Sequence, residues 1–150
     1  MRRNPNLVPL SRDHHYGLLC SWKIKEGIKK RIPADRIKNY VNYFWHHHLS
    51  SHFEIEDKVL PEVQNEILQI QMEKEHKEIS KLINSINQSA SIQLLQDFAL
   101  ALQKHIRFEE RVVFPNYELH LSENELNEIG YQLNEIHVKG EDLYTDEFWK

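Results

Sequence analysis

The chain has 150 residues, of which 40% are hydrophobic and 28% charged, a composition typical of a soluble globular protein with one core. The formal net charge of −4 and the scattered Lys and Arg residues argue against a nucleic-acid partner. The one cysteine, Cys20, excludes intrachain disulfides and cysteine-rich zinc or iron–sulfur sites. Apolar runs of signal-peptide or membrane-span length are absent, so we expect a single cytoplasmic domain over residues 1–150 with no membrane partner.

Helical spacing of hydrophobic residues dominates the chain, because glycine and proline are scarce and alternating polarity is absent. The expected helices run, in chain order, from a cap at Ser11 or Asp13 to about Lys30, from Pro33 to about Leu60, from about Glu66 to Asn87, from about Ile92 to Phe114, and from a capping box at Ser122–Glu125 to about His137. Pro61 and Pro115 are expected to end or bend the second and fourth helices. This pattern predicts an all-α, up-down-up-down four-helix bundle with a short extra C-terminal helix.

A short pattern occurs twice, near the ends of the second and fourth helices, in which a histidine precedes a glutamate by four residues. His52 precedes Glu56, and His105 precedes Glu109. Positions i and i+4 lie about 40° apart on one face of an α-helix, so the imidazole and the carboxylate of each pair point the same way. Two such helices facing each other can hold two metal ions between them.

Histidines also lie on the hydrophobic faces of the other two long helices. His76 lies on such a face of the third helix. On the first helix, His15 aligns with Trp22, whereas His14 aligns with Leu18. The sequence leaves both histidines open and slightly favours His15.

Further histidines differ in their placement on the helices. The triplet at positions 46–48 cannot point inward as a whole, because consecutive helical residues are about 100° apart. His48 shares the face of His52 and is the candidate ligand of the three. His120 and His137 lie beyond the hydrophobic faces and are not expected to bind a metal.

The combination of these groups favours a metal site over the simpler alternatives. A lone histidine in a core is more often hydrogen-bonded than metal-bound, and a single His-x-x-x-Glu pair is more often a surface contact. Several buried carboxylates and imidazoles on four helices need a common partner, because burying them unpaired is costly. The candidate ligands are His15, His48, His52, Glu56, His76, His105 and Glu109. For Glu75 an acid–base role and a solvated surface carboxylate both remain open.

These motifs resemble the hemerythrin family in its HHE cation-binding branch. They are also similar to the di-iron domain of iron–sulfur-cluster-repair proteins, in the Leu-Ser-Ser-His run that ends at His52 and in the pair Glu75-His76. The resemblance implies a non-haem centre of two iron ions bridged by Glu56 and Glu109. The histidines that match the family, one per helix, are His15, His52, His76 and His105. His48 is the expected fifth histidine ligand.

Departures from the family pattern weaken an oxygen-storage role without weakening metal binding. Oxygen-carrying hemerythrins have an HxxxH pair on the third helix, where this chain has Met72 and Ser80 around His76. Their aspartate on the fourth helix is Glu109 here. A ferritin-like site would need paired Glu-x-x-His motifs, of which only residues 73–76 provide one. The ligand types suit iron, and other divalent metals such as zinc, manganese or nickel are possible.

Three functions follow from a site of this kind. The first is a small di-iron protein that binds dioxygen or nitric oxide, in sensing or in protection against oxidative or nitrosative stress. The second is a di-iron enzyme that reduces nitric oxide or peroxide, or a donor of iron for cluster repair. The third is a metal-stabilised structural or partner-binding module. The sequence identifies no protein partner.

Overall fold

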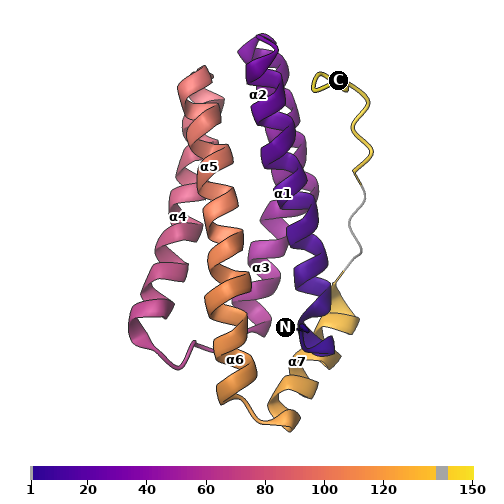
Figure 1. The fold of residues 1–150 in the computed structure, drawn as a ribbon, viewed down its shortest axis with the longest axis vertical. Helices are drawn as coiled ribbons and strands as arrows, with labels where there is room; N and C mark the ends of the chain where they lie inside the picture. The colour runs from indigo at the N-terminus through magenta and orange to yellow at the C-terminus, as the bar shows by residue number, and fades with distance from the viewer. Residues whose placement is uncertain (1, 138–141) are drawn as a thin grey trace.

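The fold of the chain is all-helical over the residues that the computed structural model describes, 2–137 and 142–150 (Figure 1). The α-helices are α1 (Val8–Lys29), α2 (Ala34–Phe44), α3 (Ser50–Val59), α4 (Glu66–Gln88), α5 (Ile92–Phe108), α6 (Phe114–His120) and α7 (Glu123–Ile136). A short 3-10 helix precedes α1 at Pro5–Leu7, and single π-helical turns lie at Trp45–Leu49 and Glu109–Val113.

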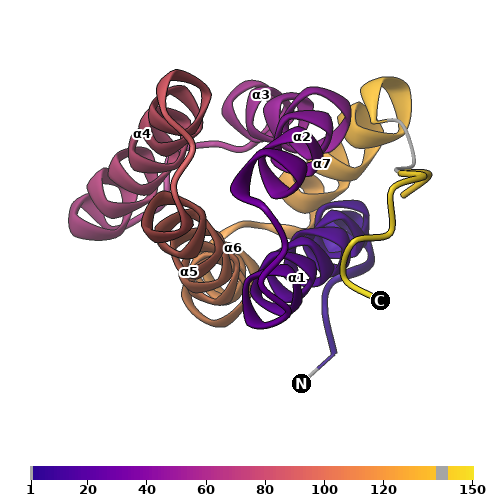
Figure 2. The ribbon, with the colours of Figure 1, turned by 90° about the horizontal axis from the view of Figure 1, so that it is seen from above.

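The helices form four long rods that run alternately up and down. The π-helical turns join α2 to α3 and α5 to α6, so each of these pairs is one rod beside α1 and α4 (Figure 1). α7 lies next to α1 and α3 outside the four rods (Figure 2). The predicted fold class, an up-down-up-down bundle with an extra C-terminal helix, is confirmed. In the part of the chain that is described, none of the helices combines the length and the apolar character that crossing a membrane requires.

Several helix ends follow the signals of the sequence. The Asn65 side chain accepts the backbone N–H groups of Ile67 and Leu68 at the start of α4. At the start of α7, Ser122 and Glu125 form the expected capping box. Local side-chain chemistry therefore sets where these helices begin.

The first helix begins earlier than expected, at Val8, and neither Ser11 nor Asp13 caps it. Pro9 fits the first turn, because the backbone N–H groups at this position have no partner within the helix. Both expected capping residues thus lie inside α1, where their side chains are available for contacts with other helices.

Pro115 does not end the fourth rod, which continues to His120. The N–H of Phe114 bonds to the carbonyl of Glu109 five residues earlier, which forms the π-helical turn. Because Pro115 has no N–H, the carbonyl of Glu110 lacks a partner in this turn and accepts a hydrogen bond from Arg3 at 2.6 Å instead.

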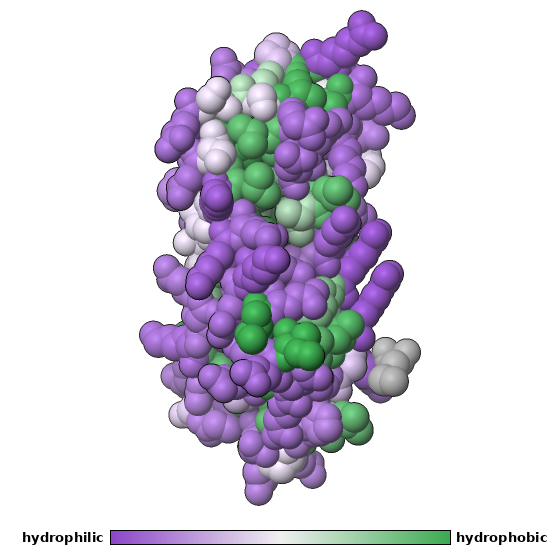
Figure 3. Space-filling model, turned by 90° about the vertical axis from the view of Figure 1, so that its left-hand side faces the viewer, coloured by the Kyte–Doolittle hydropathy of each residue, from purple (hydrophilic) through white to green (hydrophobic). Residues whose placement is uncertain are grey.

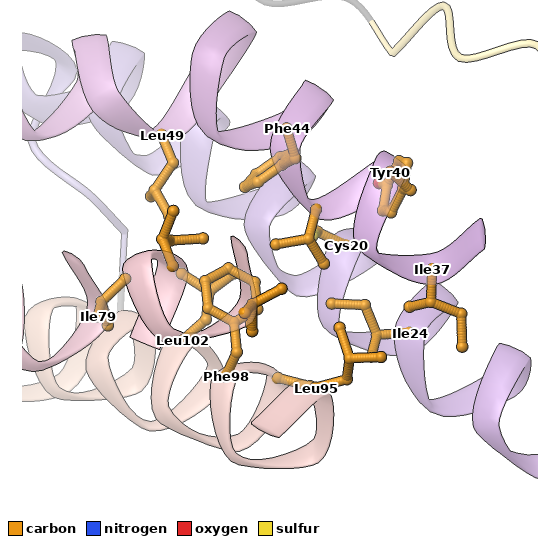
Figure 4. Close-up of a cluster of buried hydrophobic side chains, with 14 of the residues drawn as sticks. Cys20, Ile24, Ile37, Tyr40, Phe44, Leu49, Ile79, Leu95, Phe98 and Leu102 are labelled. Atoms are coloured by element: carbon orange, nitrogen blue, oxygen red, sulfur yellow. The ribbon is translucent and has the colours of Figure 1, made fainter. Parts of the chain in front are cut away.

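The hydrophobic core consists of two clusters, one at each end of the bundle. The upper cluster joins α1, α2, α4 and α5, and Figure 4 shows its side chains pointing toward one another, among them Ile24, Phe44, Phe98 and Leu102. The lower cluster lies near the N-terminus and includes Leu7, Leu10, Val59, Met72, Val113, Phe114, Tyr117, Leu126 and Leu133. On every rod, a polar segment separates the two clusters.

The C-terminal residues 142–150 contain no helix, yet they belong to the core. Phe148 and Trp149 are buried in the upper cluster. Ion pairs of Asp142 with Lys23 and of Asp146 with Arg36 attach this segment to α1 and α2. Burial of two aromatic side chains therefore fixes the end of the chain.

Small residues decide which face of α1 points inward. A Cβ atom added to Gly17 would lie 2.5 Å from a side-chain carbon of Ile106, so α1 approaches α5 closely. The hydroxyl of Ser21 donates to the carbonyl of Ala99 at 2.9 Å. Leu18 and Trp22, by contrast, are 39% and 50% exposed. Leu18 and Trp22 thus mark the wrong face of α1.

The outer side of α4 faces solvent. Figure 3 shows mostly hydrophilic side chains on this side of the molecule, with hydrophobic ones in separate groups. Ile67 and Ile70 are the large hydrophobic residues of α4 that are exposed. The inner side carries Met72, His76 and Ile79, which are buried. α4 is therefore amphipathic, as a rod of a bundle should be.

Candidate metal centre

Six polar side chains from the four rods meet between the two hydrophobic clusters. They are His14 of α1, His52 and Glu56 of α3, His76 of α4, His105 of α5, and Glu109 at the start of the second π-helical turn. All six are at most 9% exposed. Charged and imidazole groups buried to this degree require partners.

The six side chains form two groups that share both carboxylates. One group is His14, His52, Glu56 and Glu109; the other is Glu56, His76, His105 and Glu109. Within each group, one candidate ligand atom of every residue lies within 4.8 Å of the others. The arrangement therefore offers places for two cations with Glu56 and Glu109 between them.

The distances to Glu109 agree with bridging. Its Oε1 atom lies 3.0 Å from Nε2 of His14 in the first group and 3.2 Å from Nε2 of His105 in the second. Two atoms that each lie about 2.1 Å from one cation are separated by about 3.0 Å at right angles and about 3.4 Å at the tetrahedral angle. Both observed separations fall within or close to that range.

Glu56 repeats the same arrangement from the opposite side. Its Oε1 atom lies 3.2 Å from Nε2 of His52 in the first group and 3.5 Å from Nε2 of His76 in the second. Each carboxylate thus stands between one histidine of each group.

Most of the inward-facing atoms have no hydrogen bond. This holds for Nε2 of His52, His76 and His105, for both oxygens of Glu56, and for Oε2 of Glu109, all of which are buried. A buried polar atom without a partner costs about 1–3 kcal/mol. Cations would satisfy these atoms together, so the residues present fit a metal centre.

The outer ring nitrogens of three histidines contact carboxylates. Nδ1 of His14 lies 2.8 Å from Glu110, and Nδ1 of His52 lies 2.9 Å from Asp13. Nδ1 of His105 lies 2.8 Å from Glu75. An ionised carboxylate only accepts, so each ring donates its Nδ1–H, and in the neutral imidazole the Nε2 lone pair then points inward. Outer carboxylates of this kind orient metal-binding histidines in proteins.

His76 is held less firmly than the other three histidines. Its Nδ1 atom lies 3.6 Å from a carboxylate oxygen of Asp57, whose side chain is 71% exposed. The ring instead stacks on Phe53, with the ring centroids 4.2 Å apart. Packing, rather than an outer hydrogen bond, therefore orients this imidazole.

The pKa values of His105, His52 and Glu109 shift so that these three side chains remain charged. Burial alone would lower the pKa of His105, but the negative charge of Glu109 and the hydrogen bond to Glu75 raise it to about 10. The pKa of His52 is raised well above its usual value, because Glu56 and Asp13 outweigh burial. Burial would raise the pKa of Glu109, but the charge of His105 holds it well below the usual range. Without metal, protons therefore take the place of cations beside these carboxylates.

A cavity of about 40 Å³ adjoins the centre. His14, His52, His105 and Glu109 line it on the side of the centre. Other wall residues are Tyr16, Gly17, Phe44, Leu49, Phe53, Ile55, Leu102 and Ile106. Since one water needs about 10–15 Å³ by the same measure, the cavity has room for a ligand of a few atoms.

The structure brings together five of the expected ligands, His52, Glu56, His76, His105 and Glu109. Both His-x-x-x-Glu pairs point inward as the helical spacing predicts. These five residues come from the rods α2–α3, α4 and α5–α6. The remaining rod, α1, contributes His14 in place of the expected His15.

The expected placement of His15 is corrected by the structure. Its side chain is exposed, whereas His14 is 4% exposed and belongs to the first group. The reason lies in the small residues of α1: Gly17 faces the core, three positions after His14. If Trp22 is taken to face the core, the inward face of α1 is predicted about one residue away from its true position, at His15 and not at His14.

His48 also lies outside both groups. Its ring stacks on Tyr16, with the ring centroids 5.9 Å apart, and it contacts Phe44 at 5.3 Å. The π-helical turn at Trp45–Leu49 contains His48, so the spacing of a regular α-helix does not extend back from His52. His48 instead lines the cavity beside the centre.

Sequence reasoning singled out Glu75 but missed the two other outer carboxylates, Asp13 and Glu110. Asp13 and Glu110 each stand next in sequence to a residue of the centre, and this adjacency is a signal that can be searched for. His137 also donates to Asp13, at 2.9 Å, but no sequence signal links it to a residue 124 positions earlier.

The fold and the site define a helical-bundle protein with a buried histidine–carboxylate cluster that can hold metal cations. The family model described as the hemerythrin HHE cation binding domain matches residues 18–117. This match covers more than half of the chain, which therefore belongs to the hemerythrin HHE cation-binding family. Comparisons with curated proteins and with solved structures gave no match. Asp13, His14 and His137 lie outside the matched range.

Proposed function

We propose that the protein is a non-haem di-iron protein that binds dioxygen or nitric oxide, in sensing or in protection against oxidative or nitrosative stress. The observation that carries this proposal is the pair of ligand groups that share Glu56 and Glu109. Family membership supports cation binding, with iron as the typical metal. The cavity beside the first group supports a small exogenous ligand.

In this proposal His14 and His52 hold one cation, and His76 and His105 hold the other. Each group offers two imidazoles and two carboxylates, which resembles in donor type the histidine–carboxylate sets that hold non-haem iron with open positions. Two bound iron ions would supply a redox-active place for a diatomic ligand.

The protein's own residues prepare this place. Glu110, Asp13 and Glu75 fix the histidine tautomers and thereby set which nitrogen faces the cations. Apolar side chains along the cavity, among them Phe44 and Leu102, limit the access of water. A small uncharged ligand would find little competition there from solvent.

Metal analysis combined with visible spectroscopy tests the proposal. We expect about two iron ions per chain in protein purified from iron-supplemented cells. The absorption spectrum should change reversibly when dioxygen or nitric oxide is added to the reduced protein. A colourless protein with one zinc ion per chain and no response to either gas would contradict the proposal.

A second candidate is a di-iron enzyme that reduces nitric oxide or peroxide, and Glu75 favours it. This carboxylate touches His105 at 2.8 Å, its side chain is 22% exposed, and it lines a surface hollow near Lys104. It thus connects the centre with solvent, as a proton carrier would. Turnover of nitric oxide or peroxide should fall at least tenfold in Glu75→Gln at equal iron content. Unchanged turnover would contradict this role of Glu75.

A further inference from the structure

Two hollows lie on either side of one small group of side chains. The first is the cavity beside the metal centre, and the second is a surface groove of about 360 Å³ between α1 and α7. Asp13, Tyr16 and His137 line both of them. These three residues therefore form the wall that separates the groove from the cavity.

Within this wall, His137 holds Asp13 in place. Nε2 of His137 donates to Oδ2 of Asp13 at 2.9 Å, and the same oxygen accepts from Nδ1 of His52 at 2.9 Å. One carboxylate oxygen thus links the end of α7 to a residue of the metal centre. The side chain of His137 is 12% exposed, so it covers the carboxylate from the solvent side.

The position of His137 in the chain allows it to move more readily than the rest of the wall. It is the C-cap residue of α7 and has left helical geometry, with φ −78° and ψ 127°. Its backbone N–H still bonds to the carbonyl of Leu133 at 2.8 Å. The backbone is therefore anchored, and rotation of the side chain has to break the hydrogen bond to Asp13. By contrast, Tyr16 lies in the middle of α1 and its ring stacks on His48.

We propose that His137 is a gate residue: a small ligand passes from the groove between α1 and α7 into the cavity beside the centre, and the hydrogen bond from His137 to Asp13 closes this route. The proposal rests on the proposed function, because it requires a ligand that binds at the centre. It adds the route of that ligand and the residue that controls it.

The two hollows restrict which ligands can use the route. The cavity of about 40 Å³ admits molecules of two or three heavy atoms, such as diatomic gases or a linear anion. In the groove, Arg12 stands at the outer side and provides positive charge. We therefore expect small neutral ligands and singly charged anions to pass, and larger or cationic molecules to be excluded.

The route meets the centre at one of its two halves. The cavity touches His14 and His52, the two histidines of the first group, whereas His76 does not line it. A ligand that passes His137 would thus arrive first beside His14 and His52, which would hold one of the two cations. His47 and Ser51 also line the cavity and are exposed, so they mark an alternative mouth. The experiment must distinguish these two routes.

Stopped-flow measurement of azide binding to the iron-loaded full chain distinguishes them. If His137 closes the route, His137→Ala raises the association and dissociation rates by the same factor, at least fivefold, while Kd stays within twofold of wild type. His137→Gln retains an N–H donor toward Asp13 and should keep rates close to those of wild type. His120→Ala, which removes an exposed histidine at the end of α6, is the matched control and should change nothing.

Two results would overturn the proposal. Unchanged azide rates in His137→Ala would show that ligands pass elsewhere, with His47 and Ser51 as the alternative mouth. A change of Kd and of the absorption spectrum without parallel changes of both rates would show that His137 only positions Asp13 and His52.

Failure of the proposed function has a different signature, because azide would then not bind wild type at all. In that case the gate is tested by deuterium exchange at the ring carbon between the two nitrogens of each histidine, followed by mass spectrometry of the protein as purified. His137→Ala should accelerate exchange of His52 at least threefold and leave His76 unchanged. Equal exchange of His52 in both proteins would overturn the gate.

Discussion

The upper hydrophobic cluster and the metal centre show two different ways of filling the interior of one bundle. In the upper cluster, apolar side chains such as Phe98 and Leu102 are fully buried and complete the packing by themselves. One layer below, Glu56 and His76 present buried atoms that no other protein atom hydrogen-bonds. The polypeptide alone completes the packing of the first region, whereas the second leaves buried polar atoms that bound cations would satisfy.

The two regions differ in how burial of their side chains contributes to the free energy of folding. Burying one large apolar side chain contributes about 1.5–3 kcal/mol to folding. Each buried polar atom without a partner costs about 1–3 kcal/mol. The layer of the centre therefore opposes folding in the absence of metal, and the two hydrophobic clusters above and below it must hold the bundle together. Local conflict of this kind is typical of functional sites.

The largest effect is expected from a residue that belongs to both ligand groups. Glu56 belongs to both ligand groups and would share its charge between the two proposed cations, so Glu56→Gln should weaken binding of both ions by more than about 100-fold. Metal analysis after dialysis checks this prediction. Glu54→Gln, on the same helix but exposed, is the control. Retention of one tightly bound ion in Glu56→Gln would contradict the shared role.

A truncation in the upper cluster should affect stability but not metal stoichiometry. Phe98→Ala leaves a cavity in a fully buried site and should lower the free energy of unfolding by about 3–5 kcal/mol. Trp22→Ala, on the exposed face of α1, should change it by about 0.5 kcal/mol or less. Denaturant titration measures both. A loss of bound metal in folded Phe98→Ala would mean that the two regions are not separable.

Removal of a carboxylate that hydrogen-bonds the outer nitrogen of a histidine should have an intermediate effect on metal affinity. Asp13→Ala removes the carboxylate that fixes His52 and should weaken metal binding by about 10–100-fold. Asp57→Ala is the matched control, since its carboxylate lies 3.6 Å from His76 and is mostly exposed. Competition titration with a chelator compares the two. Equal effects of both variants would argue that the outer hydrogen bond to His52 has no special weight.

A further effect concerns the pH dependence of the metal-free protein. The pKa of His105 is raised from 6.5 to about 10, so its contribution to stability is complete below pH 6.5 and is lost as the pH rises through about 10. The pKa of Glu109 is lowered, so its contribution is present above pH 4.5 and is lost as the pH falls below that value.

Thermal unfolding at pH 6.5, 8 and 10 checks the alkaline side. The Tm of the metal-free protein should fall across this series, whereas the metal-loaded protein should change less, because a cation replaces the proton beside Glu109. Parallel curves for the two forms would contradict the competition between protons and cations.

The sequence was sufficient where side-chain spacing and helix geometry agree. His52 with Glu56, and His105 with Glu109, lie one regular turn apart, so their common direction follows from the helix alone. His76 follows from its place between Met72 and Ile79 on an amphipathic helix. The four rods follow from the same periodicity.

The remainder of the site depends on packing that periodicity does not encode. His14 faces the centre because Gly17 allows close contact with Ile106, and a glycine carries no hydrophobic signal. His48 departs from its expected face because it lies in a π-helical turn, and the helix propensities of the residues do not predict such a turn. His137 reaches Asp13 only after α7 has docked on the bundle.

The central claim is that two cations lie between Glu56 and Glu109, each held by two histidines. Anomalous diffraction at the iron edge from crystals of the iron-loaded protein tests it most directly. The account predicts two iron peaks within the cluster, one beside His14 and His52 and the other beside His76 and His105. A single peak, or iron bound at His15 on the surface of α1, would contradict it.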